Sequence, residues 1–146
     1  NCEESLDWHL LEEPMHAGLA RWVRELNAIY QREPSLHQVD FDGAGFTWID
    51  CNDNENSVIS LIRRARDPDD FTVMVANFTP VPRPGYRIGV PAGGWYREVL
   101  NSDAESYGGS NMGNAGGVMT EPIAAHGYDH SLSLIVPPLG FLLLKK

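Results

Sequence analysis

The sequence predicts a mainly β protein, in which an antiparallel β-sandwich follows one amphipathic helix. The first observation behind this is an apolar stripe at helical spacing near the N-terminus, formed by Leu19, Trp22, Val23, Leu26, Ile29 and Tyr30. The second is that helix signals disappear from Phe41 onward, where short apolar runs alternate with turns rich in Asp, Asn, Gly and Pro. A chain of 146 residues is long enough for one domain, or for one domain and a fragment.

The helix is bounded by two prolines. Pro14 suits an early helical position, where the missing N–H has no intrahelical partner in any case. Pro34 ends the pattern, because proline lacks the amide and clashes with the preceding turn. One helix cannot bury an apolar stripe alone, so it packs either on the sandwich or on a part of a larger protein outside this sequence.

Eight short strands are expected after the helix. They are residues 46–51, 57–63, 71–79, 86–90, 95–100, 118–124, 131–136 and 141–144. The run at 71–79 is dense in Val and Met, which predicts burial on both faces. Pro80, Pro82 and Pro84 are expected to end pairing, because proline donates no ladder hydrogen bond. Regular turn signals between short strands favour an antiparallel sandwich.

Residues 107–117 are rich in glycine but do not form a phosphate loop. Gly108 and Gly113 have the Walker spacing, yet Asn114 stands where the lysine is required. Ser110 breaks the dinucleotide-binding pattern, and the following residues are β-like rather than the start of a helix. This segment is therefore expected to be an irregular connection between strands.

Charge and composition exclude several classes of partner. The net charge is −9, with 11 basic against 20 acidic residues, which argues against nucleic acid and anionic membranes. No apolar run approaches the ~20 residues of a membrane span. Cys2 and Cys51 are too few and too far apart for a disulfide framework, so free thiols in the cytoplasm are expected.

No metal site is expected. Asp50, Asn52 and Asn54 match the first ligand positions of a calcium loop, but Glu55 replaces its glycine and Leu61 its bidentate glutamate. The other turn acids are expected to cap turns through local hydrogen bonds.

Catalytic chemistry finds no support either. His126 and His130 have zinc-like helical spacing, but Gly127 and the β run after His130 argue for a polar turn. No G-x-S-x-G nucleophile elbow occurs. We therefore expect no catalytic residue and no cofactor in this chain.

One binding hypothesis remains, based on aromatic residues spread over the β part. Aromatic rings stack on the C–H faces of sugars in shallow grooves. The alternative is that most of these rings belong to the core or to a sheet face, since strands are rich in aromatics. The candidate glucan-binding residues are Trp48, Tyr86, Trp95, Tyr96 and Tyr107.

Several sequence segments together carry a specific family resemblance. They are SLDWHLL (5–11), RELN (24–27), GFTW (45–48), NFTPVPR (77–83), NSD (101–103), YGGSN (107–111), GNAGG (113–117), SLSL (131–134) and PPL (137–139). With these segments, essentially the whole chain closely resembles the C-terminal end of bacterial 1,4-α-glucan branching enzymes of the α-amylase family.

The resemblance implies two domains. Residues 1–40 would end the catalytic (β/α)₈ barrel with its last outer helix, and residues 41–146 would form the C-terminal β-sandwich. The helix stripe would then be uncovered because its partner surface lies on the barrel. The family's catalytic carboxylates lie upstream, so none maps here. Loops that follow barrel strands form the active face, so Leu6, Asp7 and Trp8 are expected near its rim, without a catalytic role.

Three roles are weighed for the fragment. In the first hypothesis, the fragment is a non-catalytic structural domain that braces the barrel of a bacterial cytoplasmic enzyme that branches glycogen. In the second, it is an accessory module that binds α-glucan. A third hypothesis is self-association through the exposed stripe of Leu19, Trp22, Val23 and Leu26. The expected partners are the barrel and glucan, not nucleic acid or membrane.

Overall fold

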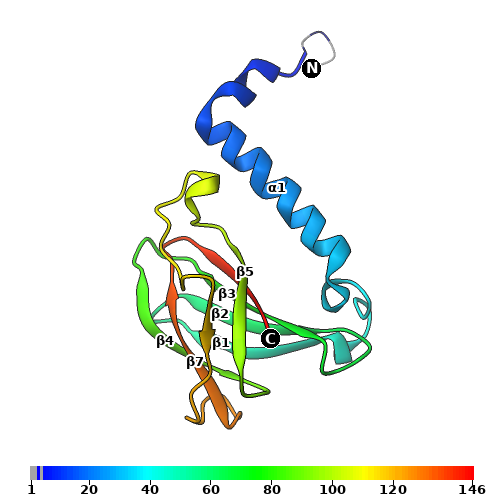
Figure 1. Ribbon diagram of the computed structural model, residues 1–146, viewed down its shortest axis with the longest axis vertical. Coiled ribbons are helices and arrows are strands. Elements are labelled where there is room, and N and C mark those ends of the chain that lie inside the picture. The colour runs from blue at the N-terminus through cyan, green and yellow to red at the C-terminus, as the bar shows by residue number, and fades with distance from the viewer. Residues whose placement is uncertain (1–2, 4) are drawn as a thin grey trace.

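The computed structural model describes residue 3 and residues 5–146 (Figure 1). Cys2 lies outside the described residues. The helices, with η for 3₁₀ turns, are η1 (Trp8–Glu12), α1 (Pro14–Arg32), η2 (Pro34–Leu36), η3 (Gly43–Gly45) and η4 (Glu105–Tyr107). The strands are β1 (Phe46–Asp53), β2 (Val58–Arg64), β3 (Phe71–Asn77), β4 (Arg83–Val90), β5 (Trp95–Asn101), β6 (Gly117–Met119), β7 (His130–Val136) and β8 (Phe141–Lys145).

The strands form two antiparallel sheets, as predicted. The larger has the order β1-β2-β3-β8-β5-β6, and the smaller pairs β4 with β7. Between them lies the main core, to which the larger sheet contributes residues such as Ile62 and Val73 and the smaller sheet residues such as Ile88 and Leu134. Inward-facing aliphatic residues on both sheets remove apolar surface from water, and this burial drives the packing of the layers.

A second core makes the fold three-layered. The second half of α1 lies on the outer face of the larger sheet, where Ile29 packs with Leu36, Leu100 and Leu143. The predicted two-sided burial of β3 is confirmed, because Val75 faces the main core and Met74 faces the second. The strand between the two cores therefore carries apolar residues on both sides.

The predicted helix is confirmed, with Pro14 at its first turn and its end at Arg32, two residues before Pro34. The expectation that its whole stripe lacks a partner surface is wrong. Trp22, Leu26 and Ile29 pack against the larger sheet and η4. Figure 1 shows that η1 and the first half of α1 instead extend beyond the sheets.

Two strand predictions need correction around prolines. The expected strand at 118–124 is only β6, because Pro122 has no N–H to donate to a ladder; Glu121 makes a single bridge to Ser131. Conversely, β4 begins at Arg83 and so includes Pro84. Its pairing with β7 is irregular between Arg83 and Tyr86, and such bulges tolerate proline.

Strand β3 ends two residues earlier than expected because Asn77 turns the chain. Its buried side chain donates from Nδ2 to the Val81 and Pro137 carbonyls at 2.8 and 3.0 Å. Its Oδ1 accepts from the Thr79 amide at 3.0 Å. Asn77 is thus a structural residue in the loop after β3.

Candidate functional site

The glycine-rich segment is an irregular loop held from within. Asp103 accepts hydrogen bonds from the Ser110 and Met112 amides, both at 3.0 Å. Burial acts to raise the pKa of Asp103, but these hydrogen bonds outweigh it and hold the pKa below its usual value. Asn114 fixes the far end, pairing with both backbone groups of Ile135 at 2.8 and 3.1 Å.

The same loop packs directly against α1, a contact that the sequence did not predict. Gly18 lies so close to the Tyr107 backbone that an added Cβ would be 2.7 Å from its carbonyl carbon. Trp22 meets the Tyr107 ring edge-on at 5.1 Å between centroids. Arg21 donates from a guanidinium N–H to the Ser106 carbonyl at 2.9 Å. In the sequence, the one signal for this contact is a glycine inside an otherwise strong helix pattern.

Tyr107 therefore serves as a helix contact. Its hydroxyl donates to the Glu25 carboxylate. Burial, followed by this hydrogen bond and the charge of Glu25, raises the pKa of Tyr107 to about 12. The hydroxyl and the ring of Tyr107 thus both contact α1.

The hydroxyls of the other two candidate tyrosines also form hydrogen bonds within the protein. Tyr96 is 0% exposed, and its hydroxyl donates to the Ala92 carbonyl at 2.9 Å. A ring with no exposed face offers no stacking surface, so we remove Tyr96 from the candidate set. Tyr86 donates to Asp53 Oδ2 at 2.7 Å, and burial, then this carboxylate, raises its pKa above the usual value.

The two candidate tryptophans are exposed but far apart. Trp48 is 47% and Trp95 50% exposed. Trp48 lies on β1, and Trp95 on β5, with β2, β3 and β8 between them. Four strand spacings correspond to roughly 19 Å. Trp48 and Trp95 therefore do not belong to one compact site.

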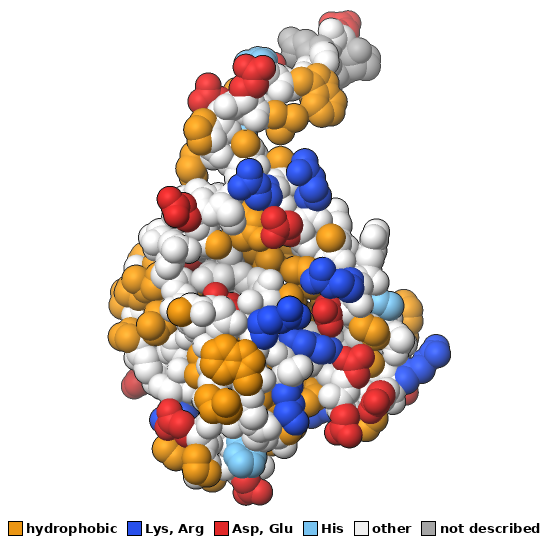
Figure 2. Space-filling model, viewed as in Figure 1, with side chains coloured by type: hydrophobic (Ala, Val, Ile, Leu, Met, Phe, Trp, Pro, Cys, Tyr) orange, Lys and Arg blue, Asp and Glu red, His pale blue; other side chains and the backbone are white. Residues whose placement is uncertain are grey.

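The three residues expected near the rim of the active face lie beside α1. Leu6, Asp7 and Trp8 line an open depression of about 660 Å³ with Leu11, His16, Leu19 and neighbouring residues. The Asp7 carbonyl accepts from the Leu10 amide at 2.9 Å, which holds η1. Leu6 and Trp8 expose more than half of their surface. Figure 2 shows hydrophobic side chains on this projecting arm.

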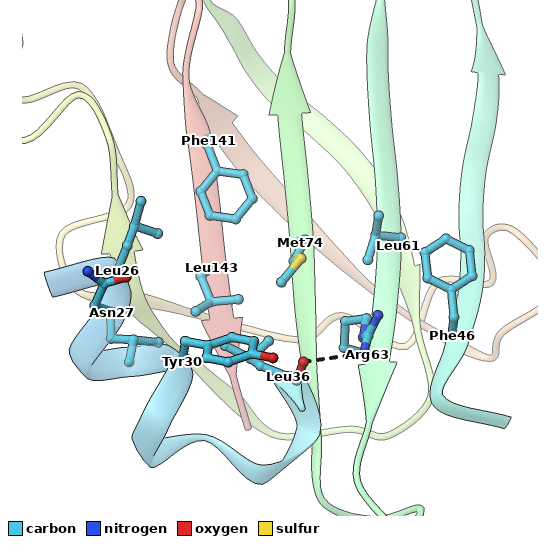
Figure 3. A pocket seen from close by; sticks show the side chains of 11 residues that line it. Leu26, Asn27, Tyr30, Leu36, Phe46, Leu61, Arg63, Met74, Phe141 and Leu143 are labelled. Carbon is cyan, nitrogen blue, oxygen red and sulfur yellow. Dashed lines mark hydrogen bonds between the residues drawn. The ribbon is translucent and has the colours of Figure 1, made fainter. Parts of the chain in front are cut away.

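A second hollow, unforeseen from sequence, lies beside the second half of α1 (Figure 3). Its volume is about 440 Å³. The lining residues are Leu26, Asn27, Ile29, Tyr30, Leu36, Phe46, Leu61, Arg63, Met74, Phe141 and Leu143. Most of them are apolar, but Asn27 and Arg63 are polar, and within the described residues the buried Nε of Arg63 has no hydrogen-bond partner.

The calcium-like and zinc-like residues contact one another and backbone amides. Asp50 Oδ1 caps the Asn52 amide at 2.8 Å, and its other oxygen lies 3.5 Å from His126 Nε2. His126 Nδ1 accepts from the Gly89 amide at 3.1 Å, while His130 begins β7. Over residue 3 and residues 5–146, no three His, Cys, Asp or Glu side chains gather as a metal site. Cys51 is a free, exposed thiol.

Some turn acids cap local amides, as predicted, whereas Asp40 and Asp70 instead pair with Arg63 and Lys145. Asp42 accepts from the Ala44 amide at 2.9 Å, and Asp67 from the Asp69 amide at 3.0 Å. Asp53 accepts from the Asn56 amide at 3.0 Å. In the part of the chain that the structure describes, no helix is both long and apolar enough to cross a membrane.

These features define an all-β sandwich with a helix on one face and two apolar hollows beside that helix. Residues 48–146 match the family described as alpha amylase, C-terminal all-beta domain. The chain belongs to this family.

Relatives at high identity extend the match over the whole chain. The chain is 51% identical over 146 residues to the 1,4-alpha-glucan branching enzyme GlgB of Paramagnetospirillum magneticum, covering 100% of this chain and 20% of that protein. It is 56% identical over 142 residues to that of Burkholderia thailandensis, covering 97% and 17%. For Aquifex aeolicus the identity is 52% over 143 residues, covering 98% and 23%. The similarity is to the C-terminal part of these enzymes, and the chain spans about a fifth of their length.

Proposed function

We propose that this chain is the C-terminal region of a bacterial, cytoplasmic 1,4-α-glucan branching enzyme and acts there as a non-catalytic structural domain. Residues 1–40 end the catalytic barrel, and residues 41–146 are the domain that braces it. The parent enzyme transfers α-1,4-glucan segments to form the α-1,6 branches of glycogen. Its catalytic carboxylates lie upstream of this sequence.

The observation that carries this proposal is that α1 has one covered and one exposed apolar side. Trp22 and Ile29 bind the helix to the sandwich. Leu19 and Val23, on another side of the helix, stay 61% and 48% exposed. Exposed apolar side chains gathered beside Trp8 are typical of a surface that another protein domain covers. The helix thus links the sandwich to the catalytic region.

The test compares two valine substitutions in the full-length enzyme. Val23→Glu places a charge on the exposed side of α1, and Val81→Glu is the matched control, since Val81 is 50% exposed on a loop elsewhere. We expect Val23→Glu to lower the melting temperature and the branching activity, measured by iodine staining of amylose, and Val81→Glu to change neither. In the isolated chain neither variant changes stability. Equal behaviour of both full-length variants would overturn the proposal.

The alternative role, an accessory glucan-binding module, is supported by the exposed rings of Trp48 and Trp95. Gly117 packs against the Trp95 ring, where any Cβ would clash, so the ring is held in place while half exposed. Affinity electrophoresis of the isolated chain in gels containing glycogen tests this role. Retardation that disappears in Trp95→Ala supports it, and migration unaffected by glycogen removes it.

A further inference from the structure

One patch on the outer face of the larger sheet lies at the β5–β6 end, where α1 leaves it exposed. Trp95 and Arg97 alternate with the buried Tyr96 on β5, so their side chains point away from the main core. On β6, Met119 is the cross-strand partner of Trp95, and Gly117 is the partner of Arg97. Trp95 and Met119 are 50% and 57% exposed. We call Trp95, Arg97, Gly117 and Met119 the β5–β6 patch.

The Trp95 ring packs on backbone and still keeps an open surface. A Cβ at Gly117 would lie 2.5 Å from Cζ2 of the ring, so the ring lies directly against the β6 backbone. Because this packing already restricts the ring, a ligand that stacks on it costs little further side-chain entropy. The exposed half of Trp95 suits the flat C–H face of a sugar ring.

Arg97 places an unpaired positive charge beside this ring. Over residue 3 and residues 5–146, its guanidinium has no hydrogen bond and no ion pair, although acidic residues outnumber basic ones by 20 to 11. Its cross-strand partner on β8 is Lys145, and like charges directly opposite one another repel. Lys145 itself is bound by Asp70 and Glu33. The charge of Lys145 is therefore offset within the protein, whereas that of Arg97 is not.

A second free cation lies at the same end of β5. Lys146 is exposed, and a Cβ at Gly94 would lie 3.4 Å from its Cε, so its side chain passes beside the residue before Trp95. In the described part of the chain, the Lys146 ammonium also forms no hydrogen bond or ion pair. Figure 2 shows both basic and hydrophobic side chains on the sandwich surface below the projecting arm. The patch thus combines an aromatic surface with two unpaired cations.

The spacing along β5 suits a ligand that has a ring and a charged substituent. A rise of about 3.3 Å per residue places the α-carbons of Trp95 and Arg97 roughly 6.5 Å apart. A ring stacked on Trp95 therefore brings a substituent within reach of the guanidinium. The guanidinium fork matches two phosphate oxygens at once, and such charge-assisted bonds are stronger than bonds to neutral hydroxyls.

We propose that the β5–β6 patch binds a phosphorylated sugar, either free or as a phosphate ester on a glucan. The sugar ring stacks on Trp95, Arg97 donates to the phosphate oxygens, and Lys146 adds a second positive charge. A neutral glucan would leave Arg97 without a counterion, and inorganic phosphate would leave the ring unused. The inference goes beyond the bracing role and does not depend on it. It also assigns Trp95 a different ligand from the neutral glucan of the alternative role.

Isothermal titration calorimetry of the full-length enzyme with glucose 6-phosphate tests the proposal. Arg66→Gln is the matched control for Arg97→Gln, because Arg66 is also exposed and its guanidinium also has no partner within the described residues. We expect the dissociation constant to rise roughly 10- to 100-fold in Arg97→Gln, since charge-assisted hydrogen bonds are lost. It should rise several-fold in Trp95→Ala and stay unchanged in Arg66→Gln. A melting curve of each variant verifies that it is folded.

Further probes identify the ligand. Glucose alone and inorganic phosphate alone are expected to bind about ten-fold more weakly than glucose 6-phosphate, or weaker still. Tighter binding of maltotriose 6-phosphate than of glucose 6-phosphate identifies an ester on a glucan, and equal binding identifies a free sugar phosphate. Both results support the proposal.

Several results would overturn it. Unphosphorylated maltotriose that binds as tightly as maltotriose 6-phosphate assigns the patch to neutral glucan. Adenosine monophosphate that binds more tightly than glucose 6-phosphate assigns it to a nucleotide, and inorganic phosphate that binds as tightly makes it a simple anion patch. Absence of binding, or equal dissociation constants with and without Arg97, removes the site. The proposed function is tested separately by Val23→Glu, so either can fail alone.

Discussion

Replacement of Gly18 by alanine tests the close packing of α1 against the glycine-rich loop. In an ordinary helix interior this change stabilises by about 1 kcal/mol, because glycine has the greater backbone freedom to lose. Here the new Cβ would lie 2.7 Å from the Tyr107 carbonyl carbon and closer still to its oxygen. The obstacle is backbone, which a rotamer change cannot move aside. The helix and the loop must therefore separate.

The separation weakens the two contacts that Tyr107 makes with the next turns of α1. The edge-on pair of Trp22 and Tyr107 contributes ~0.5–1.5 kcal/mol. The hydrogen bond from the Tyr107 hydroxyl to the Glu25 carboxylate contributes about 1.5–3 kcal/mol in general, and less here because the site is partly exposed. Set against the gain of about 1 kcal/mol in helix propensity, the net result is destabilisation by roughly 1–2 kcal/mol.

Urea unfolding of the isolated chain measures this difference. Gly43→Ala is the control, because a Cβ at Gly43 meets no atom within 4 Å. We expect the midpoint to fall for Gly18→Ala and to stay the same or rise for Gly43→Ala. A Gly18→Ala protein as stable as the unaltered chain would refute the close packing of α1 on the loop.

Further substitutions test the loop and both cores. The pKa of Tyr107 is raised to about 12 in the fold, so its contribution is complete below pH 10 and is lost as the pH rises from 10 to 12; Tyr107→Phe should flatten this part of the stability profile, and an unchanged profile contradicts the contact with Glu25. The pKa of Asp103 is lowered, so its contribution is present above pH 4 and is lost as the pH falls below that; Asp103→Asn should weaken the acid dependence of unfolding, and retained dependence would show that this carboxylate does not hold the loop. Ile29→Ala should cost about 2–5 kcal/mol in urea unfolding because Ile29 is buried in the second core, and a loss below about 1 kcal/mol would mean that α1 is not packed on the sheet.

The elements of the fold were largely predictable because their signals are local. The helical stripe, the flanking prolines and the short β runs each depend on residues close in sequence. The errors fall where tertiary contacts decide, as at Pro84, which a bulge accommodates, and at Pro122, where pairing stops after β6. The end of β3 likewise depends on Asn77 reaching Pro137, which lies far along the chain.

The candidate site was less predictable, because it depends on which strands become neighbours. Trp95 and Tyr96 are adjacent in sequence, yet strand alternation leaves one half exposed and buries the other. Arg97 and Lys145 become neighbours only through the pairing of β5 with β8, which are far apart in the chain. The partial cover by α1 could not be inferred from the helical stripe alone, since both halves of the stripe are apolar.

The central claim is that α1 joins the sandwich to a catalytic region through its projecting side. Hydrogen exchange of amides 15–24, compared between the isolated chain and the full-length enzyme, tests this most directly. We predict fast exchange in the isolated chain, where Leu19 and Val23 are exposed, and exchange slowed by orders of magnitude in the full-length enzyme. Equal exchange in the two proteins would contradict the account.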